Sequence, residues 1–315
     1  MTKLIMKINI ISRKNGVGLS QDIKIIEHYL NELGIHTTFH DFSEKIQFSP
    51  IKYDINVFLE IINIRWMTQA KENWIIPNQE WFEPHWKNAL LRFNKILCKT
   101  HHAFNIFRTI NKRSRYIGFT SEDKYDPNID KDFNQFLHIA GKSGTKQTNL
   151  IWETWKNNPQ LPQLTIVQDK NKFIQREKLS NLTYIYDRLE ENELKEMQNK
   201  IGIHLCPSEA EGFGHYIMEA LSCQSVVLTT NASPMTELVQ KETGFYVDVV
   251  KQERMRLSLK NIISVETLEK AVININITEE QELVEMGKRG REFYLNNDKS
   301  FKIRFKQIIK DIIKG

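Results

Sequence analysis

Short apolar segments alternate with helical patterns through the first 120 residues, and the alternation repeats in the second half of the chain. This alternation is typical of doubly wound parallel sheets, in which a crossover helix joins one parallel strand to the next. We therefore predict an α/β protein with two Rossmann-like domains. The predicted strands are residues 7–12, 36–40, 56–60, 74–76, 96–99 and 116–119 in the first domain, and 135–140, 164–168, 182–186, 201–206, 226–230 and 245–247 in the second.

The chain length also favours two domains, because 315 residues exceed the usual size of a single hydrophobic core. Between Ser121 and Asp132 the sequence turns polar and interrupts the alternation, which predicts a linker. We predict an N-terminal domain at residues 1–121, a linker at 122–134, a second domain at 135–295 and a C-terminal helix at 296–315.

The predicted C-terminal helix is amphipathic and basic. Its apolar stripe comprises Phe301, Phe305, Ile308, Ile309 and Ile312, and most of its lysines lie off that stripe. Residues 288–315 hold nine Lys or Arg against three acidic residues, so the rest of the chain is close to neutral although the total charge is +5. A near-neutral body argues against a nucleic-acid-binding surface. A basic amphipathic helix can lie on an anionic membrane, so peripheral membrane contact is one interpretation.

Other features of the sequence concern location and metals. No apolar run approaches the roughly 20 residues that span a bilayer, and the N-terminus lacks a signal-peptide pattern. The three cysteines, Cys98, Cys206 and Cys223, lack the spacing of metal ligands, and two of them lie in predicted buried strands. These features predict a cytoplasmic protein with reduced thiols and no bound metal.

A glycine turn follows the first predicted strand and precedes a helix. It contains Gly16 and Gly18, the first two glycines of a dinucleotide-binding fingerprint, and Asp41 ends the second strand near the place of a ribose-binding acid. Gln21 stands where the third glycine belongs. A nicotinamide-dependent oxidoreductase is therefore one alternative.

A second glycine turn follows the predicted strand at 135–140 and carries Lys142, Ser143 and Lys146. Gly141-Lys142-Ser143 spells the end of a phosphate-binding P-loop. That motif needs a glycine five positions earlier, where Phe136 stands, so a P-loop is excluded. Taken alone, the two lysines could be solvated side chains on a loop.

The segment from Glu211 to Glu219 places two carboxylates eight positions apart around Gly212 and Gly214. It follows the predicted strand at 201–206 and leads into a helix, so backbone amides and the positive end of the helix face one place. A strand, a glycine turn and a helix indicate an anion site. The added pair of carboxylates favours a nucleotide sugar as its ligand.

This segment resembles the retaining glycosyltransferases with two Rossmann-like domains (GT-B type), specifically glycosyltransferase family 4. The resemblance rests on Pro207-Ser208, on Glu-Gly-Phe-Gly from Glu211 and on Glu219-Ala220, and extends over about residues 135–247. It implies a metal-independent enzyme that moves a hexose, by default glucose, to a hydroxyl of a glycan or glycolipid. The implied donor is a nucleoside diphosphate sugar, with UDP favoured over GDP or ADP. The resemblance also implies that the C-terminal helix crosses back to the N-terminal domain.

The resemblance further implies roles for individual residues. Lys142 and Lys146 match the two cations that hold the donor diphosphate, so neither a metal nor another cofactor is expected. Glu211 is expected to contact the donor sugar and Glu219 the ribose hydroxyls. The other expected donor-binding residues are Gly16, Gly18, Ser143, Tyr186, Leu189, Gly212, Phe213 and Gly214.

On the acceptor side the sequence departs from the family. Members often carry a histidine after the strand equivalent to 74–76, whereas Asn78, Gln79 and Glu80 follow it here. We predict Asn78, Glu80 and His101 as acceptor-side residues, with His101 in a polar turn after the next strand. The missing histidine leaves open a non-catalytic protein that binds a sugar nucleotide.

Overall fold

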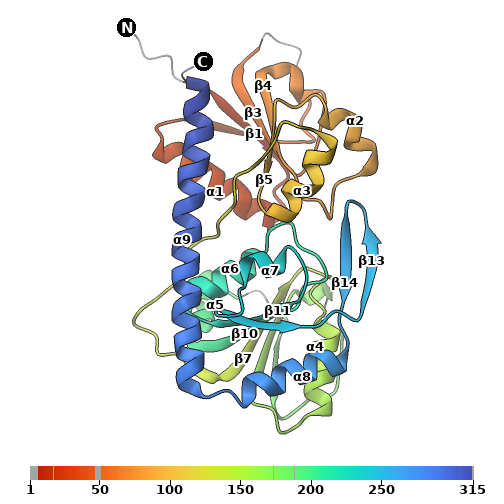
Figure 1. Cartoon of the computed structure of the whole chain (residues 1–315), viewed down its shortest axis with the longest axis vertical. Helices are drawn as coiled ribbons and strands as arrows, with labels where there is room; N and C mark the ends of the chain where they lie inside the picture. Colours follow the sequence, from red (N-terminus) through yellow and green to blue (C-terminus); the bar gives the residue numbers. More distant parts are fainter. Residues whose placement is uncertain (1–5, 17, 47–50, 173, 188, 314–315) are drawn as a thin grey trace. The chain divides into compact units, whose positions relative to one another are not determined.

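The computed structural model describes residues 6–16, 18–46, 51–172, 174–187 and 189–313 of the chain (Figure 1). It divides into two compact units. The first comprises Met1–Ser121, Met255–Ser258 and Asp298–Gly315, and the second comprises Glu122–Arg254 and Leu259–Asn297. Each unit is built on a six-stranded sheet of parallel strands, so the predicted α/β class is confirmed.

The first sheet has the strand order β2-β1-β3-β4-β5-β6. Its strands are β1 Ile8–Ser12, β2 Thr37–Asp41, β3 Tyr53–Leu59, β4 Ala70–Ile76, β5 Lys95–Cys98 and β6 Ser114–Tyr116. Its helices are α1 Gly18–Glu32, α2 Lys87–Leu90 and α3 His101–Ile110, with 3-10 turns at Trp66–Gln69 (η1) and Pro84–Trp86 (η2). Five of the six predicted strands lie where expected, whereas β6 ends at Tyr116 and overlaps the predicted strand 116–119 only at that residue.

Three buried asparagines form a ladder across the first sheet. Asn9, Asn56 and Asn73 occupy paired positions on β1, β3 and β4. Asn9 donates to Asn56 at 3.0 Å, and Asn56 donates to Asn73 at 2.9 Å and to the Trp66 carbonyl at 2.7 Å. Because a shift of one residue would break these bonds, the ladder fixes the register of the three strands.

The last helix, α9, runs from Glu280 to Ile313, and its residues from Asp298 onward belong to the first unit. There Phe301 packs on Tyr29 and Phe119 at centroid distances of 5.3 and 5.2 Å. The Tyr29 hydroxyl donates to the Asp298 carboxylate at 2.7 Å. The predicted return of the C-terminal helix is therefore confirmed. Phe301, Phe305 and Ile309 of the predicted stripe are buried, and the side chain of Ile312 lies outside the described residues.

The second sheet has the strand order β12-β11-β10-β7-β8-β9. Its strands are β7 Asp132–Gly141, β8 Leu164–Gln168, β9 Leu182–Ile185, β10 Ile201–Cys206, β11 Val226–Thr230 and β12 Gly244–Val247. Its helices are α4 Thr148–Asn157, α5 Glu191–Lys200, α6 His215–Ser222, α7 Met235–Leu238 and α8 Val265–Asn276, with a 3-10 turn at Lys170–Lys172 (η3). The six predicted strands of this domain are all present.

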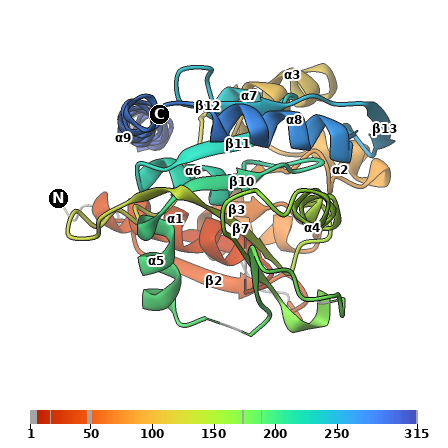
Figure 2. The ribbon, with the colours of Figure 1, turned by 90° about the horizontal axis from the view of Figure 1, so that it is seen from below.

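Apolar side chains cover both faces of the second sheet. Helices α4 and α8 lie side by side (Figure 2) and pack Trp155, Leu268 and Val272 against Phe136 and neighbouring strand residues. Leu137 points to the opposite face, where Met197 of α5 packs. Burial on both faces explains why β10 and β11 read as continuous apolar runs.

An additional hairpin follows β12, formed by β13 Lys251–Met255 and β14 Ser258–Ile262. The sequence analysis did not predict it. The first four residues of β13 are exposed, so the segment lacks the apolar run that marks the other strands.

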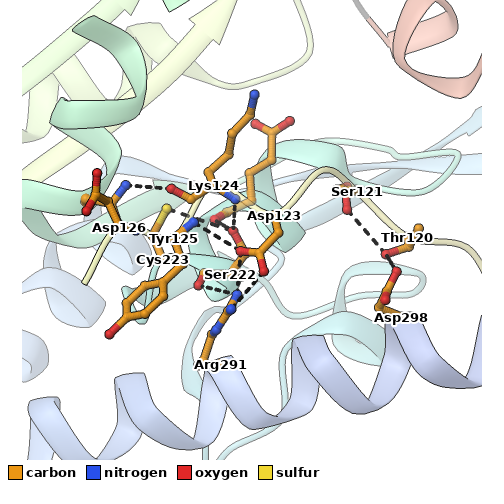
Figure 3. Close-up of polar contacts among 12 residues, drawn as sticks. Thr120, Ser121, Asp123, Lys124, Tyr125, Asp126, Ser222, Cys223, Arg291 and Asp298 are labelled. Carbon is orange, nitrogen blue, oxygen red and sulfur yellow. Dashed lines mark hydrogen bonds and ion pairs between the residues drawn. The ribbon is translucent and has the colours of Figure 1, made fainter. Parts of the chain in front are cut away.

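Part of the predicted linker is held by contacts within the second unit (Figure 3). Arg291 of α9 donates to both carboxylate oxygens of Asp123, at 2.6 and 2.8 Å, and to the Ser222 carbonyl at 2.9 Å. The backbone N–H of Lys124 donates to the Ser222 hydroxyl at 3.0 Å. Strand β7 begins at Asp132, three residues before the predicted strand start. None of the helices in the described ranges combines the length and the apolar character needed to cross a membrane.

Candidate functional site

The candidate site of the second unit lies at the carboxyl ends of β7 and β10, which are neighbouring strands of the sheet. In this sheet the chain winds outward in one direction from β7 and in the other from β10, which is the Rossmann strand order. The loops after these two strands therefore leave in opposite directions. Open α/β sheets bind ligands at such a switch point, beyond the carboxyl ends of the strands.

One backbone hydrogen bond and one side-chain hydrogen bond join the loop after β7 to the loop after β10. The N–H of Glu209 donates to the Thr145 carbonyl at 2.9 Å. Gln147, which has a positive φ of 54° just before α4, donates from its side chain to the Pro207 carbonyl at 2.8 Å and accepts from the Ile263 N–H at 3.1 Å. These hydrogen bonds fix the two loops relative to each other and to the backbone at Ile263.

A compact charged cluster lies between these loops. The Lys146 ammonium pairs with the Glu211 carboxylate and donates to the Ser208 hydroxyl at 3.1 Å. Ser208 in turn donates to Glu211 at 2.5 Å. The ammonium also lies 3.5 Å from the centroid of the Tyr216 ring. Only 13% of the Lys146 side chain and 14% of the Glu211 side chain are exposed, so solvent screens the pair weakly.

Two neighbours keep this cluster in place. The hydroxyl of Thr230 on β11 donates to the Ser208 carbonyl at 2.7 Å. The Tyr216 hydroxyl is hydrogen-bonded to the Ser208 hydroxyl, and burial raises the pKa of Tyr216 well above its ordinary value. The phenol therefore stays protonated and serves as a neutral hydrogen-bonding group. The sequence analysis missed Ser208 and Tyr216 as site residues, although both lie in the segment that carries the family resemblance.

The glycine turn before α6 has the shape expected of an anion site. Gly212, Phe213 and Gly214 are buried, and Gly214 has a φ of +111°, which a residue with a side chain rarely adopts. A Cβ at Gly214 would also lie 3.0 Å from a side-chain carbon of Leu238. The backbone N–H groups of the first turn of α6 point toward the N-terminal end of the helix, where its dipole favours an anion.

Glu219 lies on α6, separately from the Lys146–Glu211 pair. Its side chain is 7% exposed and accepts a hydrogen bond from Gln198 of α5 at 3.3 Å. Burial raises the pKa of the Cys206 thiol; the charge of Lys146 opposes this rise, and the charges of Glu211 and Glu219 add to it. Both carboxylates therefore act on the carboxyl end of β10. Gln198 is a further residue that the sequence analysis did not single out.

The other predicted donor-side residues of this unit lie in the loops that follow β7 and β9. Lys142 and Ser143 are in the loop after β7, where Lys142 is exposed and Ser143 is hydrogen-bonded to the Thr145 hydroxyl at 3.0 Å. Tyr186 follows β9 and is 47% exposed. Leu189 is partly buried and packs its side chain against the core cluster of Leu137.

The remaining predicted residues belong to the first unit. The N–H of Gly16 donates to the Ser20 hydroxyl at 2.8 Å, and Gly18 is the first residue of α1. Asn78 is half-buried and donates to Glu60 at 2.7 Å, whereas Glu80 is buried.

The prediction of a polar turn at His101 is wrong. His101 is the first residue of α3, because the Thr100 hydroxyl accepts from the Ala103 N–H at 3.0 Å and caps the helix there. Its ring is exposed and stacks on Tyr116 at a centroid distance of 3.8 Å.

In the described part of the chain, no group of three or more His, Cys, Asp or Glu side chains is arranged to hold a metal ion. The feature of this unit that best fits ligand binding is the charged cluster and glycine turn at the switch point.

Comparisons with known proteins agree with this architecture. Residues 120–278 match the family described as glycosyl transferases group 1. The fold is similar to a crystal structure of a glycosyltransferase from Rickettsia africae, with a TM-score of 0.74 and 13% identity over 99% of this chain and 100% of that one. It is also similar to a sucrose-phosphate synthase from Thermosynechococcus elongatus, with a TM-score of 0.73 and 13% identity over 98% and 99% of the two chains.

A third similar structure is the HepE protein of Anabaena, solved in complex with UDP and glucose. Its TM-score is 0.70 and its identity 12%, over 98% of this chain and 100% of that one. The same Anabaena protein has also been solved with UDP-glucose. No curated protein sequence matches the chain.

Proposed function

Since the chain belongs to the glycosyl transferases group 1 family, we propose that it transfers a hexose from a nucleoside diphosphate sugar to a hydroxyl of a glycan or glycolipid. The observation that carries this proposal is the position of the Lys146–Glu211 pair. It joins the loops after β7 and β10 at the switch point of a Rossmann-ordered sheet, beside a glycine turn and a helix start. A diphosphate and a sugar need just this combination of cation, backbone amides and carboxylate.

In the proposed reaction Lys142 and Lys146 hold the donor diphosphate. The bond from the anomeric carbon to the phosphate oxygen breaks, and a bond from that carbon to the acceptor oxygen forms on the same face of the sugar. The acceptor proton passes to the leaving phosphate oxygen, so the anomeric configuration is retained. The lysine charges oppose the negative charge that develops on the diphosphate, and on this proposal no metal is needed.

The two carboxylates have different proposed tasks. Glu211 accepts hydrogen bonds from hydroxyls of the donor sugar, and Glu219 accepts them from the ribose. The amides of Gly212, Phe213 and Gly214 complete the donor site. Tyr186 and the backbone of Leu189 are proposed beside the base, and Gly16 and Gly18 beside the phosphates.

UDP-glucose is the donor that we propose first, with GDP- and ADP-sugars as alternatives. The structures of Anabaena HepE with UDP and UDP-glucose support this choice. We place the reaction in the cytoplasm, where the buried thiols of Cys98, Cys206 and Cys223 would stay reduced. Contact of the basic helix α9 with a membrane surface is a further proposal. Its buried stripe is already used in the first unit, so that contact would rely on exposed lysines such as Lys306 and Lys310.

The first test is a thermal-shift panel of UDP, GDP, ADP and their common sugar conjugates, together with NAD and NADP, in EDTA and then in Mg²⁺. A ligand at a hundred times its dissociation constant adds about 2.7 kcal/mol of stability, which raises Tm by several degrees. We expect UDP and UDP-glucose to stabilise the protein in EDTA.

Other results of the ligand panel or of a transfer assay would change the proposed function. Stabilisation by NAD alone would replace the proposal with a nicotinamide-dependent oxidoreductase. If UDP-glucose binds but is neither hydrolysed nor transferred, the protein is a non-catalytic binder of sugar nucleotides. If transfer occurs, the anomeric configuration of the product, read by proton NMR, tests retention.

A further inference from the structure

A second polar cluster lies in the first unit, at the carboxyl ends of its strands. Glu60 directly follows β3, Asn78 lies two residues beyond β4, and Lys99 directly follows β5. Parallel strands end at one edge of their sheet, which is where open α/β sheets bind ligands. The order of this sheet reverses between β1 and β3, so Glu60 stands at its switch point.

The backbone of Glu60 adopts a conformation that side-chain-bearing residues avoid. Its φ is +64°, in the left-handed region. The N–H of Glu60 donates to the Ile76 carbonyl at 2.9 Å, and the N–H of Ile61 donates to the Leu59 carbonyl at 2.7 Å. These bonds hold the turn in place. Strained backbone of this kind is concentrated at functional sites.

The carboxyl group of Glu60 is also kept in an unfavourable environment. Burial raises the pKa of Glu60, while the hydrogen bond from Asn78 and the charge of Lys99 oppose the rise. Lys99 cannot fully compensate, because it is paired with Asp22 at 2.6 Å in a bridge whose two side chains are each 3% exposed. The fold therefore accepts both backbone strain and desolvation to hold a carboxyl group at this edge.

Asn78 gives independent evidence for a ligand. Its side-chain N–H donates to Glu60 at 2.7 Å, which turns the amide oxygen away from the carboxyl group. That oxygen is buried and has no hydrogen-bond partner in the part of the chain that the structure describes. A buried acceptor without a donor is destabilising, so a missing donor is expected nearby.

We propose that Glu60 and Asn78 together bind neighbouring hydroxyl groups of a neutral carbohydrate acceptor, and that Glu60 thereby selects which acceptor is used. This inference rests on the proposed glycosyl transfer and gives it an acceptor class. One hydroxyl donates its proton to the Asn78 oxygen. A neighbouring hydroxyl can donate to the Glu60 carboxyl group when that group is ionised, or accept from it when it is protonated. A phosphate or carboxylate ligand offers no proton to either oxygen.

The test compares three variants in the full-length protein. Glu60→Gln keeps the shape of the side chain, and Glu60→Gly removes it while permitting the positive φ. Gln224→Gly is the matched control, because Gln224 also has a positive φ, of 62°, but lies in the second unit between α6 and β11. UDP affinity is measured by calorimetry. Transfer from UDP-glucose is measured with octyl glucoside, maltose and glycerol as neutral acceptors and glycerol 3-phosphate as the anionic one.

We expect both Glu60 variants to raise KM for the neutral acceptor by about tenfold or more, with UDP affinity unchanged. Glu60→Gly should keep or raise Tm, as should Gln224→Gly, and the control should leave KM unchanged. If the Glu60 variants lose UDP affinity and also have a lower Tm, Glu60 has a structural role and the inference is overturned. An unchanged acceptor KM, or a wild type that uses only glycerol 3-phosphate, would overturn it too.

Two outcomes separate this inference from the proposed function. If the wild type binds no nucleoside diphosphate sugar, the proposed function itself fails. If it binds UDP-glucose but transfers to no probe, saturation-transfer NMR with the neutral sugars in the presence of UDP decides. Binding that is lost in Glu60→Gln supports the inference, and no binding to the wild type contradicts it.

Discussion

At the scale of single residues, the two lysines after β7 differ in their surroundings. Lys146 is enclosed by Glu211, Ser208 and Tyr216, whereas Lys142 is exposed. An exposed cation can be removed without leaving a buried partner unpaired. Its removal should therefore report on chemistry and leave folding unaffected.

We expect Lys142→Ala to lower kcat by about a hundredfold with less change in UDP-glucose affinity and little change in Tm, because the cation acts mainly on charge that develops as the sugar bond breaks. Steady-state kinetics at saturating donor measure this. Lys142→Arg, which retains the charge, is the control and should recover most of the rate. Normal turnover of Lys142→Ala would remove Lys142 from the mechanism.

A different result is expected for Glu219. The side chain is buried and is proposed to accept from the ribose hydroxyls, so Glu219→Ala should weaken UDP binding by about ten- to a hundredfold. Calorimetric titration with UDP gives the affinity directly. Glu196→Ala, at an exposed position on α5, is the control and should bind as the wild type does. UDP affinity that is unaffected by Glu219→Ala would place the ribose elsewhere.

The sequence predicted part of the site, for reasons that can be stated. Lys142, Lys146, Glu211 and Glu219, whose roles stay predictions, were singled out through motifs of neighbouring residues that local chain order preserves. The contact of Lys146 with Ser208 joins residues 62 positions apart and depends on the pairing of β7 with β10, which no local pattern records. The positive φ of Glu60 was equally hidden. Its only sequence signal is an acidic residue at the end of an apolar strand.

At the scale of secondary structure elements, the strands of both sheets were predictable because helices cover them. A strand buried on both faces must be apolar along its length, and β10 and β11 are buried at every position. The hairpin of β13 and β14 escaped prediction because β13 is mostly exposed and polar. An apolar run therefore marks the buried strands of the sheets, whereas no such run marks the exposed strand β13 of the hairpin.

Helix α9 shows a conflict between propensity and packing. Gly287 lies within this helix, where alanine would be favoured by about 1 kcal/mol. A Cβ at Gly287 would lie 2.2 Å from the backbone oxygen of Gln224, which cannot move without shifting the turn before β11. We expect Gly287→Ala to lower the free energy of unfolding by about 1–3 kcal/mol, measured by denaturant titration.

Gly290 provides the control one turn further along the same helix. A Cβ there would meet a terminal side-chain carbon of Leu221 at 3.0 Å, and a side-chain end can move aside. Gly290→Ala should therefore cost less than Gly287→Ala or even stabilise the protein. Equal effects of the two substitutions would show that close backbone packing at Gly287 is not what keeps the glycine there.

At the scale of the whole molecule, the match to glycosyl transferases group 1 confirms the family that the sequence resemblance predicted. The two units of the fold differ in one property that the sequence does not show. Both fully buried histidines, His138 and His204, belong to the second unit, and the six histidines of the first unit are exposed or half-buried. Burial lowers the pKa of His138 to about 4 and that of His204 to about 3.

These shifts predict that acid destabilises the second unit selectively. Between pH 6.5 and pH 4 an unfolded histidine binds a proton that the folded one does not, so stability falls as the pH falls. At pH 5 the loss is about 2 kcal/mol for each histidine. Hydrogen exchange by mass spectrometry, with rates corrected for the intrinsic effect of pH, should show reduced protection at pH 5 in peptides of residues 132–247 and little change in those of residues 53–119.

Substitution of His138 tests whether protonation of a buried histidine causes the loss of stability at low pH. Its Nδ1–H donates to the Leu205 carbonyl at 2.8 Å, and in the neutral ring, which burial favours, its Nε2 accepts from the Thr148 hydroxyl at 3.0 Å. His138→Gln cannot titrate, so its Tm should fall less steeply between pH 7 and pH 5 than that of the wild type, whatever the substitution does to Tm at pH 7. The exposed His36→Gln should keep the wild-type slope. A wild-type slope in His138→Gln would mean that acid acts through other groups. The selective weakness of the second unit at low pH would then have to be traced to His204 or to its carboxylates.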